Sequence, residues 1–211
     1  MSSMGRDDSL TSVLPRSLIS ASTYLTHHAQ LGVSNISPQM LKSWLEIAES
    51  KGYVKPTVYQ GQYNLLCRGY ETTLFPLLRE YNIHFNAFSP LAGGFLLGNF
   101  TAEGVQGGSR FSLGTPFNGW YDKPSMHEAI KRLKEISERE GVGMDELALR
   151  WVVHHSVLGE KDSIILGASK VQQVGKNVGQ IRKGSLDGEV VRELDALWEL
   201  VKEDGVSIVE H

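Results

Sequence analysis

The stretch from Ile83 to Gly98 reads I-H-F-N-A-F-S-P-L-A-G-G-F-L-L-G and constrains the fold more than any other part of the chain. Its first half alternates as a β-strand does. Pro90 then lacks the backbone donor that a strand needs to continue, while Gly93 and Gly94 permit positive φ angles. The pattern predicts a strand that ends near Ser89, in a loop able to present amides and a hydroxyl to an anion. From this segment alone, an ordinary strand-to-helix loop fits equally well.

The same order of a short strand and then a helix recurs elsewhere in the chain. The further strands are expected at Leu31–Asn35, Thr57–Gln62 and Ser163–Gly167, and their helices at Gln39–Ser50, Gly69–Tyr81 and Lys170–Ile181. Ser37 and Pro38 are suited to begin the first of these helices, and Ser169 the last. Strands this apolar are typical of parallel sheets that are buried on both faces. We therefore expect an α/β protein.

Three more helices complete the expected layer. They are predicted at Ser125–Glu140, Asp145–Ser156 and Asp187–Glu203. Gly141 is placed to end the first of them. Trp44, Trp151 and Trp198 lie on amphipathic segments, so we expect them to anchor the core.

Polar residues gather at the C-terminal ends of the expected strands. They are Ser34, Asn35, Gln60, Gln62, Ser89 and Ser169. In a β/α barrel this edge carries the active site. One polar strand end is usually only the start of a loop, but four such ends in one sheet predict a shared site.

Six motifs, taken in order, resemble the C-terminal half of an aldo-keto reductase. They are G-V-S-N, V-Y-Q-G-Q-Y-N, F-N-A-F-S-P-L-A-G-G-F-L-L-G, S-R-F, R-W-V-V-H-H-S and I-I-L-G-A-S-K-V-Q-Q-V-G-K-N, within about Leu31 to Glu203. The resemblance is nearest to the aflatoxin aldehyde reductase subgroup, which reduces aldehydes and some ketones with NADPH. It implies a partial (β/α)8 TIM barrel, about the last four β/α units with a C-terminal helix, over residues 31–211. Residues 1–30 are then expected to be a divergent, weakly ordered leader.

The resemblance also implies that NADP(H) is the cofactor and assigns positions to its binding. Ser34, Asn35 and Gln60 match the positions that bind the nicotinamide carboxamide, and Phe88 the one that stacks on the nicotinamide ring. Ser89, Leu91 and Gly93 match the loop around the pyrophosphate, and Arg110 matches a cofactor-contacting arginine. The positions for the adenosine 2′-phosphate and adenine are Ser169, Lys170, Gln173 and Asn177. A helix that starts near Ser169 and Lys170 suits a phosphate on physical grounds as well. Tyr121, in the long Gly-rich segment Asn99–Pro124, matches a substrate-contacting tyrosine.

The resemblance assigns no catalytic residue to this chain. Family members use an Asp, Tyr, Lys and His tetrad whose Tyr donates a proton to the carbonyl oxygen, and all four precede the G-V-S-N motif. The 30 residues before Leu31 hold no matching motif. Tyr24, His27 and His28 are the right residue types but have no strand-borne lysine partner. We expect a truncated reductase that is inactive by itself; a non-catalytic cofactor- or partner-binding remnant and an incomplete gene model are the alternatives.

Composition argues against several other classes of protein. The chain is 41% hydrophobic and 21% charged, with a net charge of −3, which leaves no basic surface for nucleic acid and no apolar run for a membrane. A single cysteine favours a reducing compartment, so the cytoplasm is expected. The expected partners are a small aldehyde or ketone and, through the bare edges of a half barrel, a second copy of the chain.

Two features invite other chemistry. Cys67 has no His or acidic residue near it in sequence, so it is expected to pack as a small apolar residue. His154 and His155 are adjacent, and adjacent residues on a helix point about 100° apart, so the pair is not expected to chelate one metal ion. At least one of the two is expected in the core.

Overall fold

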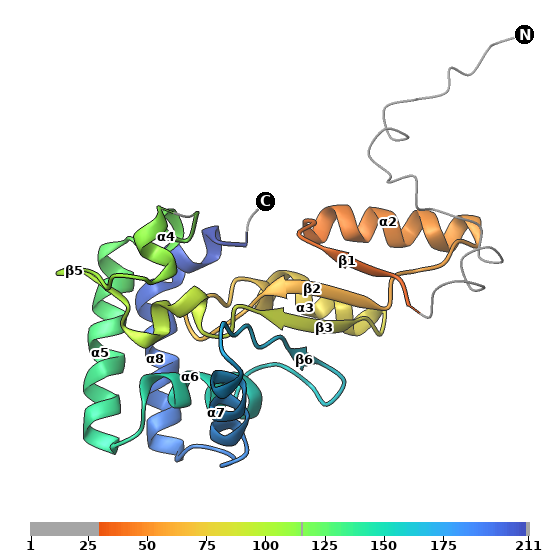
Figure 1. The fold of residues 1–211 in the computed structure, drawn as a ribbon. Coiled ribbons are helices and arrows are strands. Elements are labelled where there is room, and N and C mark those ends of the chain that lie inside the picture. Colours follow the sequence, from red (N-terminus) through yellow and green to blue (C-terminus); the bar gives the residue numbers. More distant parts are fainter. Residues whose placement is uncertain (1–29, 115, 210–211) are drawn as a thin grey trace, which may run out of the picture.

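A computed structural model describes residues 30–114 and 116–209 and contains a four-stranded parallel sheet in the order β1-β2-β3-β6 (Figure 1). The strands are β1 (Gly32–Ser34), β2 (Val58–Gln62), β3 (His84–Phe88) and β6 (Ser163–Ile164). Each of the four predicted strands is present, although β1 and β6 are shorter than predicted. The expectation of an α/β protein with a parallel sheet is confirmed.

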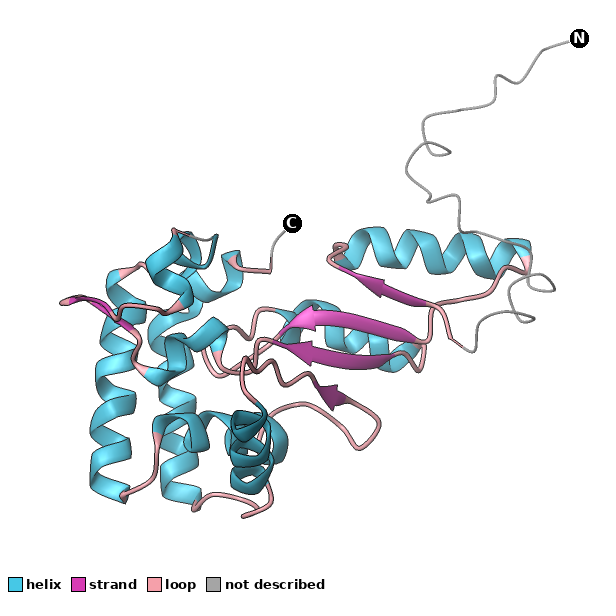
Figure 2. Cartoon of the chain, viewed as in Figure 1, coloured by secondary structure: helices cyan, strands magenta, loops and turns pink. Residues whose placement is uncertain are grey.

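Helices follow the strands: α2 and α3 lie alongside the sheet, and the later helices pack together beyond the C-terminal ends of the strands (Figure 2). They are α2 (Pro38–Lys51), α3 (Tyr70–Glu80), α4 (Pro116–Tyr121), α5 (Pro124–Glu140), α6 (Met144–His154), α7 (Val171–Ile181) and α8 (Gly188–Ser207), with 3-10 turns η1 (Ala92–Leu97) and η2 (Arg110–Leu113). A short hairpin joins β4 (Phe100–Thr101) to β5 (Gly104–Val105). Helices α5 and α8 run side by side, and α6 packs against α7 and η1.

Local signals begin and end the helices as predicted. The Ser37 hydroxyl accepts a hydrogen bond from the Met40 amide at 3.2 Å, with Pro38 as the first helical residue of α2. Gly141 ends α5 at a φ of 64°, the left-handed conformation that glycine adopts most easily. Trp44, Trp151 and Trp198 are all buried, which confirms their prediction as core residues.

The prediction that the sheet is buried on both faces is wrong. The register aligns Val33 with Tyr59 and Tyr59 with Phe85, and all three lie in the core. One residue further along, it aligns a polar row of Ser34, Gln60, Asn86 and Ser163, all exposed or half-buried. Because side chains alternate between the faces of a strand, the core covers one face and leaves the other polar. The alternation in the stretch from Ile83 indicates one polar face, whereas a count of apolar residues in each strand does not.

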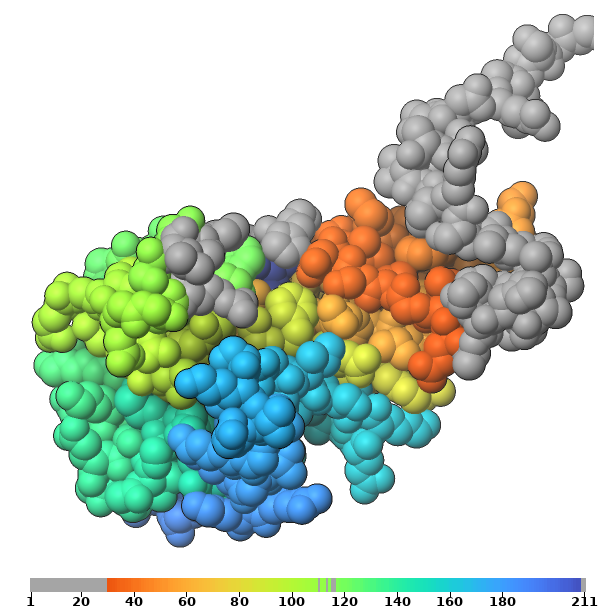
Figure 3. Space-filling view, in the orientation of Figure 1, coloured from red at the N-terminus to blue at the C-terminus, as the bar shows by residue number. Residues whose placement is uncertain are grey.

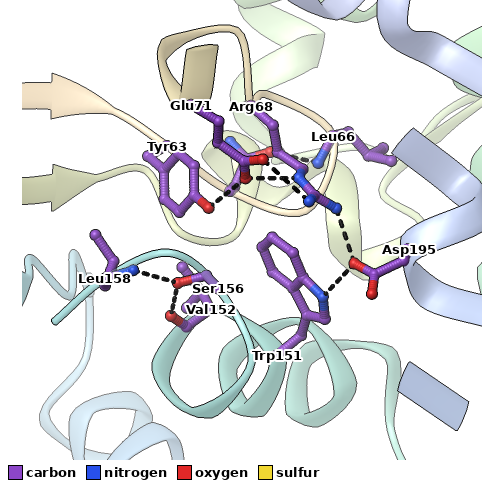
Figure 4. A network of polar contacts seen from close by, with 10 residues as sticks. Tyr63, Leu66, Arg68, Glu71, Trp151, Val152, Ser156, Leu158 and Asp195 are labelled. Atoms are coloured by element: carbon purple, nitrogen blue, oxygen red, sulfur yellow. Dashed lines mark hydrogen bonds and ion pairs between the residues drawn. The ribbon is translucent and has the colours of Figure 1, made fainter. Parts of the chain in front are cut away.

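A polar network ties the segment after β2 to α3, α6 and α8 (Figure 4). The Arg68 guanidinium donates to both carboxylate oxygens of Glu71 at 2.7 and 3.1 Å, and to Asp195 Oδ1 at 2.8 Å. Trp151 Nε1 donates to the same Asp195 oxygen at 3.1 Å, and the Tyr63 hydroxyl donates to Glu71 at 2.7 Å. The guanidinium also lies over the Trp151 ring, 4.7 Å from its centroid. Elements far apart in sequence are thus joined through one cation.

We expect Arg68→Met to lower the free energy of unfolding by about 2–4 kcal/mol, because Glu71 and Asp195 would both lose their cation. The side chains of Arg68 and Glu71 are only 15% and 17% exposed, whereas Asp195 is 45% exposed and can recover some hydration. Urea unfolding followed by tryptophan fluorescence measures the change.

The matched control is Arg132→Met. Arg132 pairs with Glu128 on the open surface of α5, with side chains 52% and 42% exposed, so its unfolding midpoint should stay at the wild-type value. An equal loss of stability in both variants would show that Arg68 has no special structural role.

Candidate functional site

A cavity of about 720 Å³ lies where the loop after β3 meets the start of α7. Its walls come from four segments: Phe88 to Leu91 with Gly93, Gly94, Leu97 and Asn99; Ile165 to Ser169; Gln173, Lys176 and Asn177 of α7; and Asp145 of α6. In Figure 3 the yellow-green loop and the blue helix lie on the same face of the molecule. The cavity therefore sits at the C-terminal edge of the sheet, where polar strand ends predicted a shared site.

This cavity brings together most of the positions predicted for the pyrophosphate and the adenosine end of a cofactor, and also Phe88, which was predicted to stack on the nicotinamide. The pyrophosphate and adenosine positions that line it are Ser89, Leu91, Gly93, Ser169, Gln173 and Asn177. Lys170 stands immediately before α7. The Arg110 side chain lies outside the described part of the structure. Their roles in binding stay predictions.

The positions predicted for the nicotinamide carboxamide lie elsewhere on the sheet. Ser34 and Gln60 are neighbours in the polar row, and both are exposed. Asn35 follows β1 at a φ of 54° and is exposed as well. None of the three lines the cavity among its described walls, although they share the sheet edge with it.

The loop after β3 holds several residues in the left-handed region. Ser89 and Ala92 have φ angles of 54° and 52°, and Gly93 and Gly94 have 66° and 107°. Non-glycine residues in this region cost about 1–3 kcal/mol each and are concentrated at ligand sites. Asn64 Nδ2 donates to the Ser89 carbonyl at 3.1 Å and so supports the bend. The predicted Gly-rich loop is therefore a tight turn whose backbone conformation is fixed by hydrogen bonding.

Helix α7 buries a polar stripe and exposes apolar residues. Asn177 and Gln180 are each 7% exposed, whereas Val171 is 85% and Val174 is 41% exposed. Gln173, Lys176 and Asn177 all line the cavity, as their spacing on one helical face allows. A surface helix normally buries its apolar face and exposes its polar face. The polar stripe of α7 is thus directed at the cavity and at α6.

The prediction that Ser169 caps α7 is wrong. Lys170 holds the extended conformation that precedes the helix, with φ −138° and ψ 141°. Gln173 Oε1 accepts hydrogen bonds from the amides of Ser169 and Lys170 at 2.9 and 3.2 Å. The helix start is therefore capped from within its own first turn, by a glutamine at the third helical position.

Asp145 is a cavity residue that sequence reasoning did not single out. Its carboxylate accepts hydrogen bonds from Lys176 Nζ and, at 3.0 Å, from Gln180 Nε2. Burial raises the pKa of the Asp145 carboxyl, but the bonds from Lys176 and Gln180 outweigh it and hold the pKa below its ordinary value. Asp145 and Lys176 are 31 residues apart, so no local sequence pattern predicts that they pair.

Tyr121 is fully buried, and its hydroxyl has internal partners. Gln62 Nε2 and Asn64 Nδ2 donate to it at 2.8 and 3.2 Å, and its ring stacks on Phe95 with centroids 5.0 Å apart. Burial raises the pKa of the Tyr121 hydroxyl. The long segment that holds it is partly ordered into a hairpin and α4. Contact of Tyr121 with a substrate stays a prediction.

The residues that invited other chemistry have structural partners instead. Cys67 is buried, and burial raises the pKa of its thiol, as expected for an inert cysteine. His154 Nε2 lies 2.9 Å from the Ile181 carbonyl, and His155 Nε2 accepts from the Leu186 amide at 2.8 Å. Neither histidine is in the core, so that prediction is wrong: His154 is exposed and His155 is half-buried, and both contact the segment at and after the end of α7.

The described residues offer neither a cluster of metal ligands nor a membrane-spanning helix. Residues 30–114 and 116–209 contain no group of three or more His, Cys, Asp or Glu side chains placed to hold a metal ion. Over the same ranges, every helix is too short or too polar to cross a lipid bilayer.

Comparison with known proteins gives the same class as the fold. The model of the Aldo/keto reductase family matches residues 29–199. Oxidoreductase sirO of Leptosphaeria maculans is 40% identical over 179 residues, covering 82% of this chain and 54% of that protein. Human Aldo-keto reductase family 7 member A3 and human Aflatoxin B1 aldehyde reductase member 2 are 36% and 35% identical, covering 82% of this chain and 56% and 51% of theirs.

A parallel sheet with helices, and with a cavity at the carboxyl ends of its strands, places the chain among the α/β proteins. Within that class, the chain belongs to the aldo/keto reductase family. It spans about half the length of the relatives that it matches. The family resemblance found in its motifs is confirmed.

We expect Asp145→Asn to lower stability near neutral pH and to matter less in acid. The folded pKa of Asp145 is depressed, so its stabilisation is present above the unfolded pKa and is lost as the pH falls through the folded pKa. Urea midpoints at pH 7, 5 and 3 should show a gap between wild type and variant that is constant at the first two values and narrows below about pH 4. A gap that widens in acid would contradict the assigned ion pair.

Proposed function

We propose that residues 31–211 form the cofactor-binding half of an NADP(H)-dependent aldo-keto reductase barrel, about its last four β/α units with a C-terminal helix. The family reaction is the reduction of aldehydes or ketones to alcohols by hydride transfer. One observation carries the proposal: a single cavity joins the bent loop after β3 to the start of α7. Its volume of about 720 Å³ lies in the range of small-molecule and cofactor sites.

The residues in and near this cavity fit the parts of a dinucleotide. Phe88 offers an aromatic face for the nicotinamide, and Ser89 with the glycine turn offers donors for the diphosphate. Lys170 and Asn177 stand at the adenosine end, and Ser34, Asn35 and Gln60 on the sheet suit the carboxamide. A Cβ atom at Gly167, in the cavity wall, would meet no atom within 4 Å, so the wall has room beside it. NADPH supplies the hydride when bound.

No proton donor is assigned to the described residues. Four buried tyrosines have internal hydrogen-bond partners, and burial raises the pKa of each: Tyr59, Tyr63, Tyr70 and Tyr121. A tyrosine that protonates a substrate near neutral pH needs the opposite shift. We therefore propose that this chain by itself binds the cofactor without reducing an aldehyde, and that a tetrad from outside it is required for turnover.

Two further properties belong to the same proposal. A cytoplasmic location agrees with the single buried cysteine, which needs no oxidising compartment. Self-association agrees with the outer edges of β1 and β6, which pair with no other strand among the described residues.

Fluorescence titration with NADPH tests the binding site. We expect saturable binding by the wild-type chain, weakened about tenfold or more (about 1.4 kcal/mol) by Gly167→Leu, because the new side chain takes up cofactor space. Gly175→Leu is the matched control: a Cβ atom there also meets nothing within 4 Å, but Gly175 does not line the cavity.

Nitrobenzaldehyde then tests turnover. We expect no oxidation of NADPH above the rate in buffer. Absence of saturable binding by the wild type would overturn the proposed site, and steady aldehyde reduction by the purified chain would overturn the assignment of the proton donor to groups outside it.

A further inference from the structure

The groups at the adenosine end of the cavity that favour an anion are already paired with oxygens of this chain. The amides of Ser169 and Lys170 donate to Gln173 Oε1 at 2.9 and 3.2 Å. The ammonium group of Lys176 donates to the Asp145 carboxylate. Among the described residues that line the cavity, Lys176 is the cationic side chain, and Asp145 neutralises it.

A separate observation supports a ligand at this end of the cavity. Asn177 is only 7% exposed, lies one turn after Gln173 on the same face of α7, and lines the cavity. Within residues 30–114 and 116–209, its side-chain amide is hydrogen-bonded to no other group, and it is not among the fully buried polar atoms without a partner, so it opens onto the cavity. An amide that faces the cavity and has no partner in the chain can hydrogen-bond a molecule bound there.

From this arrangement we infer that Asp145 is a negative specificity determinant, which sets the preference between dinucleotides with and without a phosphate monoester on the adenosine ribose. The inference rests on the proposed function and concerns the same cavity. A dinucleotide without that phosphate leaves the contact between Lys176 and Asp145 intact. One that carries the phosphate must draw Lys176 away and place a second anion beside the carboxylate.

The physical cost has two parts. Asp145 accepts hydrogen bonds from both Lys176 and Gln180, so removing Lys176 leaves a largely buried carboxylate with one donor fewer. The carboxylate and the phosphate also repel each other, most strongly at low ionic strength. Replacing Asp145 with asparagine removes the charge but keeps an oxygen that can accept from Gln180.

The test compares the Kd values of NADH and NADPH for the wild type and for Asp145→Asn. We expect the ratio of the NADH Kd to the NADPH Kd to rise at least about threefold in the variant at 50 mM salt, with a smaller rise at 0.5 M salt. Adding Lys176→Gln to the variant should remove the gain, because Lys176 is the group that Asp145 releases.

The matched control is Asp162→Asn. Asp162 is a buried carboxylate with a lowered pKa and an arginine partner, Arg79, but it does not line this cavity. The Asp162→Asn variant should be less stable than the wild type, but its ratio of the NADH Kd to the NADPH Kd should stay at the wild-type value. A change in stability alone therefore cannot produce the expected result.

The outcomes separate this inference from the proposed function. If the wild type binds neither dinucleotide, the proposed function fails. If the wild type binds and Asp145→Asn leaves the ratio unchanged, or if the gain persists without Lys176, the inference fails while the proposed function stands.

Discussion

The parallel register of β1, β2, β3 and β6 is the constraint on which the rest of the structure depends. Parallel strands bring all of their carboxyl ends to one edge, so loops that are far apart in sequence meet there. The same register stacks Val33, Tyr59 and Phe85 into the core and sends Gln60 and its neighbours to the polar face. Site and core therefore come from alternate residues of the same strands.

Helix α6 contacts both the polar network around Arg68 and the cavity wall. Near its C-terminal end, Trp151 donates to Asp195, which Arg68 links to the segment after β2 (Figure 4). At its N-terminal end, Asp145 receives Lys176 and fixes α7 against the cavity. Helix α6 thus connects the polar network to the cavity wall, through the hydrogen bond of Trp151 at one end and the ion pair of Asp145 at the other.

Elements with local causes were predictable, and those with distant partners were not. The caps at Ser37 and Gly141, like the strand that stops before Pro90, depend on residues next to them in sequence. The contact between Asp145 and Lys176 spans 31 positions, and the inverted burial of α7 depends on α6 and the cavity beside it. Family motifs identified Gln173 as a site residue, but its cap on Ser169 and Lys170 appears only in three dimensions.

Hydrogen exchange with and without NADPH tests the central claim most directly, because it reports where on the chain the cofactor is held. We expect slower exchange in the loop after β3, residues 88–94, and around the start of α7, residues 165–177, with little change in α5 and α8. Protection confined to the separate hollow between Leu78 and Asp162, or no protection anywhere, would contradict a cofactor site at the edge of this sheet.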